Sequence, residues 1–393
     1  MAGAPSATAA PSTGSAAPVP TAAASQTPAA QSVVPFLRGS GKGKYKFYSK
    51  AGLTHTTATQ DLGPIDVKAY DYMRSILVTY TTTTAGGALG TLGADGPFNA
   101  FTNVSVLQPN GQTMYQVSAG HHAAMISKYG FARANVDPRS DPTFAGVQGS
   151  ATSTATFAFR IPFELDLRDA LGALPNKDAA APFSLNLTLN TLSNTFGASE
   201  GTSNTFTVEA WLEAYDQPPT ILNGAPVQTT PPNMNTLQRW TEQNITMSTG
   251  QFDARIRKLG NYIRMLIPIS KNSSNARIVT NGWADPVQIV LDEDTKDNIS
   301  QADWQRRIWE VWGYGGAGST IDQAGTGQIP GADTGVWPIQ YCVDGRSLDE
   351  NANLYLPTIE SEDYLLRGSW GSAVSKMVVL VDEVLPQGNI FGL

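Results

Sequence analysis

Histidine and cysteine, the side chains most often used as metal ligands and nucleophiles, are scarce in this chain. It contains three histidines, His55, His121 and His122, and one cysteine, Cys342. Neighbouring side chains on a strand point to opposite faces, so His121 and His122 are not expected to reach one metal ion. No HxH, HExxH or CxxC pattern occurs. We therefore expect no metal site and no catalytic residue, and we expect Cys342 to be a small buried side chain.

Two further patterns resemble binding loops. Residues 313–318 read GYGGAG, which matches GxGxxG, but a dinucleotide fold needs this motif between a strand and a helix. Here it follows an expected helix and leads into a turn-rich stretch, so we expect a surface loop and no cofactor. Residues 291–297 read LDEDTKD, for which a solvated loop is favoured over a cation-binding loop. A pair of glycosidase carboxylates from distant strands stays open at the sequence level.

The strongest local charge feature lies near the N-terminus. Residues 1–37 carry no charged side chain, and residues 38–50 then carry five positive charges. Because the whole chain has a net charge of −7, residues 51–393 together carry −12. The basic residues are Arg38, Lys42, Lys44, Lys46 and Lys50.

The basic segment has two interpretations. It is either a solvated basic loop or an arm that meets phosphate, in lipid headgroups or nucleic acid. Tyr45, Phe47 and Tyr48 alternate with the lysines, and aromatic rings favour membrane–water interfaces. We therefore predict that Arg38 and the four lysines contact a membrane. The Ala/Pro-rich residues 1–37 have little to bury, which predicts a flexible arm over residues 1–52.

Composition limits the class of protein. The chain has 393 residues, of which only 15% are charged, and its net negative charge argues against a surface that binds specific nucleic acid. No apolar run is long enough to span a bilayer, and the N-terminus lacks the apolar core of a signal peptide, so export by the usual route is not expected. Low charge with much Thr, Ser, Asn, Gly and Ala favours close-packed protein surfaces.

The same order of predicted elements occurs twice along the chain. Strand-like segments surrounding a short helix fill residues 53–215, and a similar order fills residues 236–393. Residues 216–235 contain five prolines in twenty residues. Proline fixes φ and lacks an N–H donor, so this stretch is expected to link two all-β modules.

Local patterns predict the elements of each module. Residues 183–189 alternate apolar and polar side chains, as in a half-buried strand, and residues 101–119 predict a hairpin around Asn110 and Gly111. Residues 165–174 predict a short helix in the first module. In the second, residues 300–312 predict a helix capped by Ser300 and Asp303. Its apolar stripe is Trp304, Ile308 and Trp312.

The arrangement resembles a known family. Two jelly rolls in tandem, each with a short helix before its last strands, are similar to the double jelly-roll major capsid proteins of tectivirus-like, membrane-containing icosahedral bacteriophages. The resemblance spans about residues 53–386 and is carried by residues 92–112, 161–190, 259–266 and 303–315 with the strands that follow. The Ala/Pro-rich arm matches no motif of that family.

The resemblance implies an all-β fold of two tandem eight-stranded jelly-roll sandwiches and no enzymatic activity. It further implies a homotrimer, a pseudo-hexagonal tile that packs beside neighbouring capsomers into an icosahedral shell over an internal membrane. Penton and minor capsid proteins are the implied partners. The implied location is the virion, assembled in the host bacterial cytoplasm. Loops 130–150 and 312–336 lack periodicity and are expected at the surface, as candidates for outward towers.

Two other kinds of protein are alternatives for this sequence. A secreted two-domain β-sandwich that binds or cleaves carbohydrate is the alternative function, but it would need an export signal and clusters of surface aromatic or carboxylate side chains. A phage fibre or receptor-binding protein would need repeats or a coiled coil, and neither is visible in the sequence.

Overall fold

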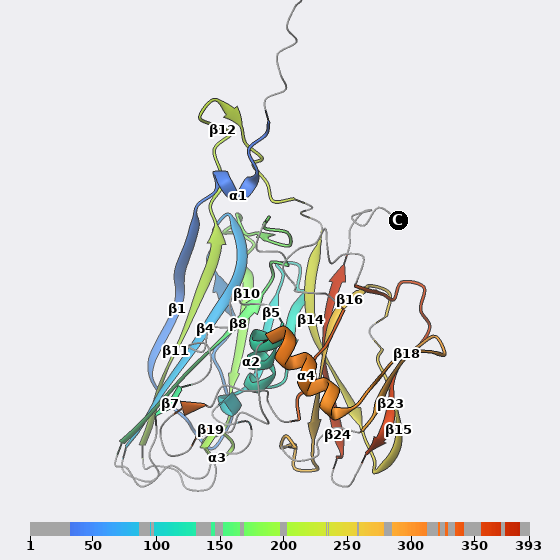
Figure 1. Ribbon diagram of the computed structural model, residues 1–393. Coiled ribbons are helices and arrows are strands. Elements are labelled where there is room, and N and C mark those ends of the chain that lie inside the picture. The colour runs from blue at the N-terminus through green and yellow to red at the C-terminus, as the bar shows by residue number, and fades with distance from the viewer. Residues whose placement is uncertain are drawn as a thin grey trace, which may run out of the picture.

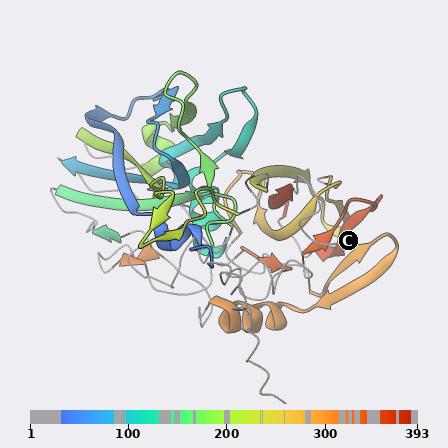
Figure 2. The ribbon, with the colours of Figure 1, turned by 90° about the horizontal axis from the view of Figure 1, so that it is seen from above.

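The computed structural model shows an elongated molecule made of two β-sandwiches that stand side by side (Figures 1 and 2). The residues that the structure describes are 32–85, 95, 98–130, 143–145, 152–165, 169–196, 203–232, 234, 236–257, 259–278, 285–312, 321–322, 327–328, 335–341, 355–370 and 374–385.

The first sandwich consists of two sheets that enclose one apolar core. One sheet has the strand order β1-β11-β4-β8-β7, with β9 paired to β4, and the other runs β2-β10-β5-β6, with β3 paired to β10. The strands of the first sheet are β1 (Lys42–Thr54), β11 (Ser203–Tyr215), β4 (Tyr72–Ala85), β8 (Thr152–Pro162), β7 (Thr143–Ala145) and β9 (Leu174–Pro175). Those of the second are β2 (Gln60–Asp61), β3 (Ile65–Val67), β10 (Phe183–Leu189), β5 (Phe101–Leu107) and β6 (Thr113–Val117).

The second sandwich repeats this plan. One sheet has the order β14-β24-β16-β21, with β22 paired to β16, and the facing sheet has the order β15-β23-β17-β18. The first set is β14 (Leu237–Thr246), β24 (Lys376–Leu385), β16 (Tyr262–Lys271), β21 (Ile339–Gln340) and β22 (Leu356–Pro357). The facing set is β15 (Gly250–Arg255), β23 (Tyr364–Trp370), β17 (Val287–Leu291) and β18 (Asp294–Ile299).

Alternating strands and turn residues form where the sequence predicts them. Along β10 the apolar residues are buried and the polar residues between them are partly exposed. Strands β5 and β6 pair as an antiparallel hairpin, and Gly111 in their turn has a φ of 83°, which only glycine adopts at little cost. The predicted all-β double sandwich is confirmed.

The two sandwiches are joined along a seam, where β14 pairs in parallel with β6 through Trp240 and Tyr115. This pairing makes one continuous sheet across both modules. Every residue of β16 is buried, as are eight of the ten residues of β24. One face of these strands packs into the second core, and the other face packs against the first. Burial on both faces explains their continuous apolar sequences.

Helix α4 (Gln301–Trp312) confirms the helix prediction in the second module. Trp304, Ile308 and Trp312 are buried. The Ser300 hydroxyl accepts a hydrogen bond from the Asp303 N–H at 3.2 Å and donates one to the Asp303 carboxylate at 2.7 Å, so the capping pair forms as expected. The helix lies on one flank of the seam (Figures 1 and 2).

The helix prediction for residues 165–174 is wrong. Residues 169–175 form a turn followed by β9. Ala170 and Gly172 have φ values of 67° and 83°, and the Leu171 N–H donates to the Asp169 side chain, so the backbone cannot be helical there.

The long helix of the first module is α2 (Gly120–Tyr129), which contains the two adjacent histidines expected on a strand. All ten of its residues are buried, so it has no polar face and no amphipathic period to detect. The remaining short helices are α1 (Phe36–Gly39), α3 (Leu192–Phe196) and the 3-10 turn η1 (Phe98–Ala100).

The segment expected as a flexible arm contains ordered structure. Lys42–Thr54 forms β1, an edge strand of the first sandwich, so the first module begins before residue 53. Ahead of it, Phe36 of α1 is buried between the rings of Tyr72 and Tyr215. Within the Pro-rich linker, β12 (Ile221–Leu222) and β13 (Ala225–Pro226) form a small hairpin.

Several predictions fall outside the described residues: the arm up to residue 31, the Gly-rich motif at 313–318, and Cys342. Of the two loops expected at the surface, only short pieces are described. These include β7, and the hairpin of β19 (Ile321–Asp322) and β20 (Gly327–Gln328). Val336, at the end of the second loop, is also described and is buried, so the surface prediction is wrong there. Strand β20 lies against β7, at the end of the molecule opposite α1 (Figure 1).

Candidate functional site

The five basic residues predicted to contact a membrane lie along one flank of the first sandwich. Arg38 is in α1, and the four lysines are on β1. Lys42 lies over the ring of Tyr215, and Lys44 and Lys46 both lie over the ring of Trp211, at 5.1 to 5.6 Å from the ring centres. Their expected contact with lipid stays a prediction.

The aromatic residues between these lysines point inward. Tyr45, Phe47 and Tyr48 pack against the first core, and the ring of Tyr45 stacks on Tyr70 with centroids 3.8 Å apart. Alternation along β1 therefore places Lys42, Lys44 and Lys46 on the face opposite Tyr45 and Phe47. A β-bulge after Lys46 turns Tyr48 toward the core as well. The aromatic rings are partly buried against the first core, which leaves less of each ring for a membrane surface. Lysines on an edge strand also hinder pairing with a foreign strand.

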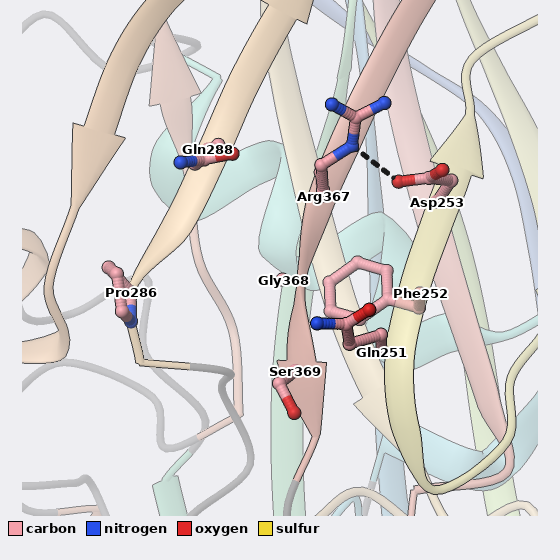
Figure 3. A pocket seen from close by; sticks show the side chains of 8 residues that line it. All are labelled: Gln251, Phe252, Asp253, Pro286, Gln288, Arg367, Gly368 and Ser369. Carbon is pink, nitrogen blue, oxygen red and sulfur yellow. Dashed lines mark hydrogen bonds and ion pairs between the residues drawn. The ribbon is translucent and has the colours of Figure 1, made fainter.

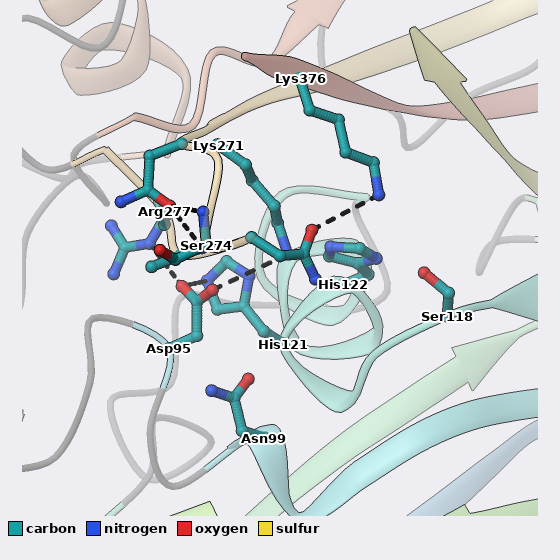
Figure 4. Close-up of polar contacts among 12 residues, drawn as sticks. Asp95, Asn99, Ser118, His121, His122, Lys271, Ser274, Arg277 and Lys376 are labelled. Atoms are coloured by element: carbon teal, nitrogen blue, oxygen red, sulfur yellow. Dashed lines mark hydrogen bonds and ion pairs between the residues drawn. The ribbon is translucent and has the colours of Figure 1, made fainter. Parts of the chain in front are cut away.

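A second cluster, the seam cluster, was not anticipated. It consists of Asp95, His121 and His122 from the first sandwich, and Glu242, Lys271 and Arg277 from the second. Figure 4 labels all of these residues except Glu242. All six side chains are at most 6% exposed. The adjacent histidines were the only signal in the sequence, and their assignment to a strand concealed it.

Asp95 connects the two sandwiches on one side of the cluster. Its carboxylate accepts a hydrogen bond from Arg277 Nε at 2.8 Å and lies 3.8 Å from Lys271 Nζ. His121 Nε2 lies 3.6 Å from the same carboxylate. Burial would raise the pKa of Asp95, but the cations Arg277 and Lys271 beside it hold that pKa well below its ordinary value. Asp95 is therefore ionised and anchored to the second sandwich.

Glu242 connects the sandwiches on the other side. It accepts hydrogen bonds from the Ser118 N–H at 2.8 Å, the Ser118 hydroxyl at 2.6 Å and His122 Nδ1 at 2.8 Å. These donors hold its pKa well below the ordinary value despite burial. Ser118 immediately precedes α2, whose N-cap residue Ala119 makes no side-chain cap, so Glu242 supplies the negative charge that a helix N-terminus favours.

The opposite end of α2 is also bound by the second sandwich. Trp312 Nε1 donates to the Tyr129 carbonyl at 3.0 Å, and Arg264 Nη2 donates to the Gly130 carbonyl at 3.0 Å. Arg264 forms a buried ion pair with Asp382 at 2.6 Å. Burial raises the pKa of Asp382, and the Arg264 charge opposes that rise. Side chains of the second sandwich therefore satisfy groups at both ends of α2.

A shallow groove of about 410 Å³ lies on the second sandwich, where β15, β23 and β17 run side by side (Figure 3). Asp253, Arg367 and Gln288 are cross-strand neighbours there, and Arg367 Nε binds the Asp253 carboxylate at 2.7 Å. Both members of this pair are about half exposed, which is typical of a surface ion pair worth little energy.

The other residues that could take part in chemistry have structural roles wherever the structure describes them. His55 is a satisfied core residue, bonded to Tyr80 at 2.6 Å and to the Asn190 carbonyl at 3.1 Å. The LDEDTKD segment is the β17–β18 hairpin, with Asp292 and Glu293 in its turn at φ values of 49° and 70°. One GxSxG spacing, residues 197–201, lies outside the described residues. It follows α3 and precedes β11, the reverse of the strand-to-helix order of a nucleophile elbow.

In the described ranges, no three histidine, cysteine or carboxylate side chains are grouped so as to hold a metal ion. None of the helices in the described part of the chain has the length and hydropathy of a bilayer-spanning helix.

No protein-family model matches the sequence, and no curated protein matches it. Solved structures do match. The STIV MCP, from Sulfolobus Turreted Icosahedral Virus, is 13% identical with a TM-score of 0.59, over 88% of this chain and 97% of that chain. The major capsid protein P2 of bacteriophage PM2 is 9% identical with a TM-score of 0.51, over 89% and 99%. PBCV-1 VP54 is 9% identical with a TM-score of 0.56, over 88% and 93%.

These alignments cover both sandwiches and nearly the full length of each capsid protein. At identities this low, the structural match establishes the fold alone. The chain is therefore a double jelly roll of the kind found in viral major capsid proteins.

Proposed function

We propose that this chain is the major capsid protein of an icosahedral virus and has a structural role, with no catalytic one. The observation that carries the proposal is the fusion of two jelly rolls into one block through a buried seam, matched end to end by viral capsid proteins. A rigid block of two similar sandwiches suits a tile, because both modules keep one orientation without a partner.

The proposed assembly is a homotrimer. Three chains would bring six similar sandwiches around a ring, giving a pseudo-hexagonal tile that packs against its neighbours. The long axes of both sandwiches run in one direction, so each block can stand upright in a shell (Figure 1). Obligate interfaces of this kind generally bury more than about 2,000 Å² and are more apolar than transient ones.

The finer assignment is a tectivirus-like bacteriophage with a membrane beneath its shell. Penton and minor capsid proteins would complete that shell, and assembly would take place in the bacterial cytoplasm. The charge asymmetry of the chain supports an interior surface, since five basic residues within residues 38–50 contrast with −12 over residues 51–393. In this arrangement the basic flank of β1 and the preceding arm face anionic lipid.

Light scattering on the purified chain tests the proposal. We expect particles of three chain masses, about 125 kDa from a chain of 41.8 kDa, or closed shells, across the micromolar to nanomolar range. A protein that stays monomeric at every concentration would contradict the capsid assignment. A trimer that never binds anionic vesicles would contradict only the membrane assignment.

A further inference from the structure

The seam cluster has a charge balance that depends on its two histidines. With His121 and His122 neutral, the carboxylates of Asp95 and Glu242 offset the cations of Lys271 and Arg277. Proton uptake by both histidines would leave two uncompensated positive charges in a site where each histidine is only 1% exposed. A buried charge without a partner is strongly unfavourable.

Few hydrogen-bond acceptors of the described residues lie beside the two histidines to stabilise protonated rings. Among the described residues, neither ring nitrogen of His121 makes a hydrogen bond, and Nε2 of His122 makes none. The carboxylate that the described residues place beside His121 is that of Asp95, which already binds Arg277. The carboxylate bonded to His122 already takes two hydrogen bonds from Ser118.

The elements packed against α2, and the strands of the second sandwich beside it, supply the surrounding charged and titratable groups. Strand β8 contributes Arg160, which pairs with Glu213, and η1 has no titratable side chain. Strand β16 contributes Lys271, β14 contributes Glu242, and Arg277 follows β16. Strand β6 contributes Tyr115, which faces Glu242, while β5 has no titratable side chain. Lys376 of β24 lies further out, and its charge lowers the pKa of Lys271. Lys128 is on α2 itself, over the ring of Tyr129.

We propose that the seam cluster is an acid-sensitive latch between the two jelly rolls, which holds the seam closed while His121 and His122 are neutral and loosens it when they bind protons. Three of its contacts join one sandwich to the other, namely Asp95 with Arg277, Asp95 with Lys271, and His122 with Glu242, while His121 lies beside Asp95 within the first sandwich. Loss of these contacts therefore acts first on the boundary between the modules.

The direction of the pH effect follows from burial. Burial lowers the pKa of His121 to about 3 and also lowers that of His122, against an ordinary value of 6.5. Opening the seam exposes both rings to water, so the open form binds protons more readily. The closed form is fully favoured above about pH 6.5 and loses its advantage as pH falls below that value. Asp95 and Glu242 add to the loss only below about pH 4.

Hydrogen exchange of α2 amides in the full chain, corrected for intrinsic exchange rates, tests the latch between pH 6.5 and 4.5. One proton taken up on opening changes the open-to-closed ratio by at most about tenfold per pH unit, and two protons by at most about 100-fold. We expect protection in α2 and β16 to fall at a rate between these limits, while β10, inside the first core, keeps its protection. An equal fall in β10 would indicate global unfolding and overturn the proposal.

Variants separate the histidines. In the double variant His121→Gln, His122→Gln, protection of α2 should no longer depend on pH in this range, and His55→Gln, away from the seam, should behave as the parent does. A double variant with the parent's slope would overturn the latch. If the double variant does not fold, deuterium exchange at the imidazole C2 position in the parent gives each histidine pKa. A value of 6.5 or higher for His121 or His122 would overturn the proposal equally.

The latch concerns the single chain, so a monomer that shows it would still refute the capsid assignment, and a shell without it would refute only the latch. Resting on the proposed function, the inference adds that mild acid would loosen each tile without first unfolding its sandwiches.

Discussion

The indole of Trp312 donates a hydrogen bond to the backbone carbonyl of Tyr129, and the two rings meet edge to face with centroids 5.5 Å apart. Trp312 belongs to α4 of the second sandwich, and Tyr129 ends α2 of the first. The last carbonyls of a helix have no partner within it, so this contact satisfies one of them from another module. The seam therefore has polar contacts at the ends of α2 and apolar packing between them.

Replacing Trp312 by phenylalanine should destabilise the chain while keeping most of the packing. The Tyr129 carbonyl would lose its donor inside the seam, which costs about 1–3 kcal/mol for a buried polar group. Chemical denaturation checks this value. Trp309, on the same helix but 60% exposed, is the matched control, and Trp309→Phe should change stability by less than about 0.5 kcal/mol. Equal effects of the two changes would show that the hydrogen bond contributes nothing.

Trp304→Ala should lower the free energy of unfolding by roughly 3–5 kcal/mol, because it empties a large buried site in the second core. Assembly should fall with it, since α4 packs Trp304 into the second core and Ile308 into the first. Thermal melting and light scattering measure the two effects. A variant that melts and assembles like the parent would mean that the apolar stripe of α4 is dispensable.

Asp382→Asn should be costly although it keeps the side-chain shape. Arg264 would remain charged and 2% exposed without its carboxylate, and breaking one member of a buried ion pair typically costs about 3–5 kcal/mol. The double variant Arg264→Met, Asp382→Leu should lose less than the sum of the single variants, because no charge is stranded. Denaturation of Arg264→Met, Asp382→Leu and the double variant gives the coupling energy, and simple additivity would argue that the pair is not coupled.

Neutralising the four lysines of β1 should weaken binding to anionic vesicles at low salt. Each lysine near such a surface contributes about 1 kcal/mol, so removing four should weaken binding by about 10³-fold. The variant carries glutamine at Lys42, Lys44, Lys46 and Lys50, and trimers should stay intact. A control with the same charge change on the second sandwich carries glutamine at Arg255, Lys296, Arg306 and Arg367. If the two variants bind vesicles equally, the basic flank has no special role at a membrane.

What the sequence determined by itself was the set of elements in which burial of one face leaves a local period. The alternation in β10, the glycine turn of the β5–β6 hairpin and the stripe of Trp304, Ile308 and Trp312 each contain their own signal, because one-sided burial imposes a local period. Two such modules around a Pro-rich linker were enough to predict a double sandwich.

The tertiary structure alone decided the seam. Helix α2 is buried all round and lacks a side-chain cap of its own, because Glu242, Arg264 and Trp312 bind its ends from the other module. Its sequence therefore shows neither an apolar stripe nor a cap. For the same reason His121 looked like a strand residue until Asp95 and the cations of the second sandwich were brought beside it. Local periodicity records which face of an element is buried, but only the packing of the two modules decides what buries it.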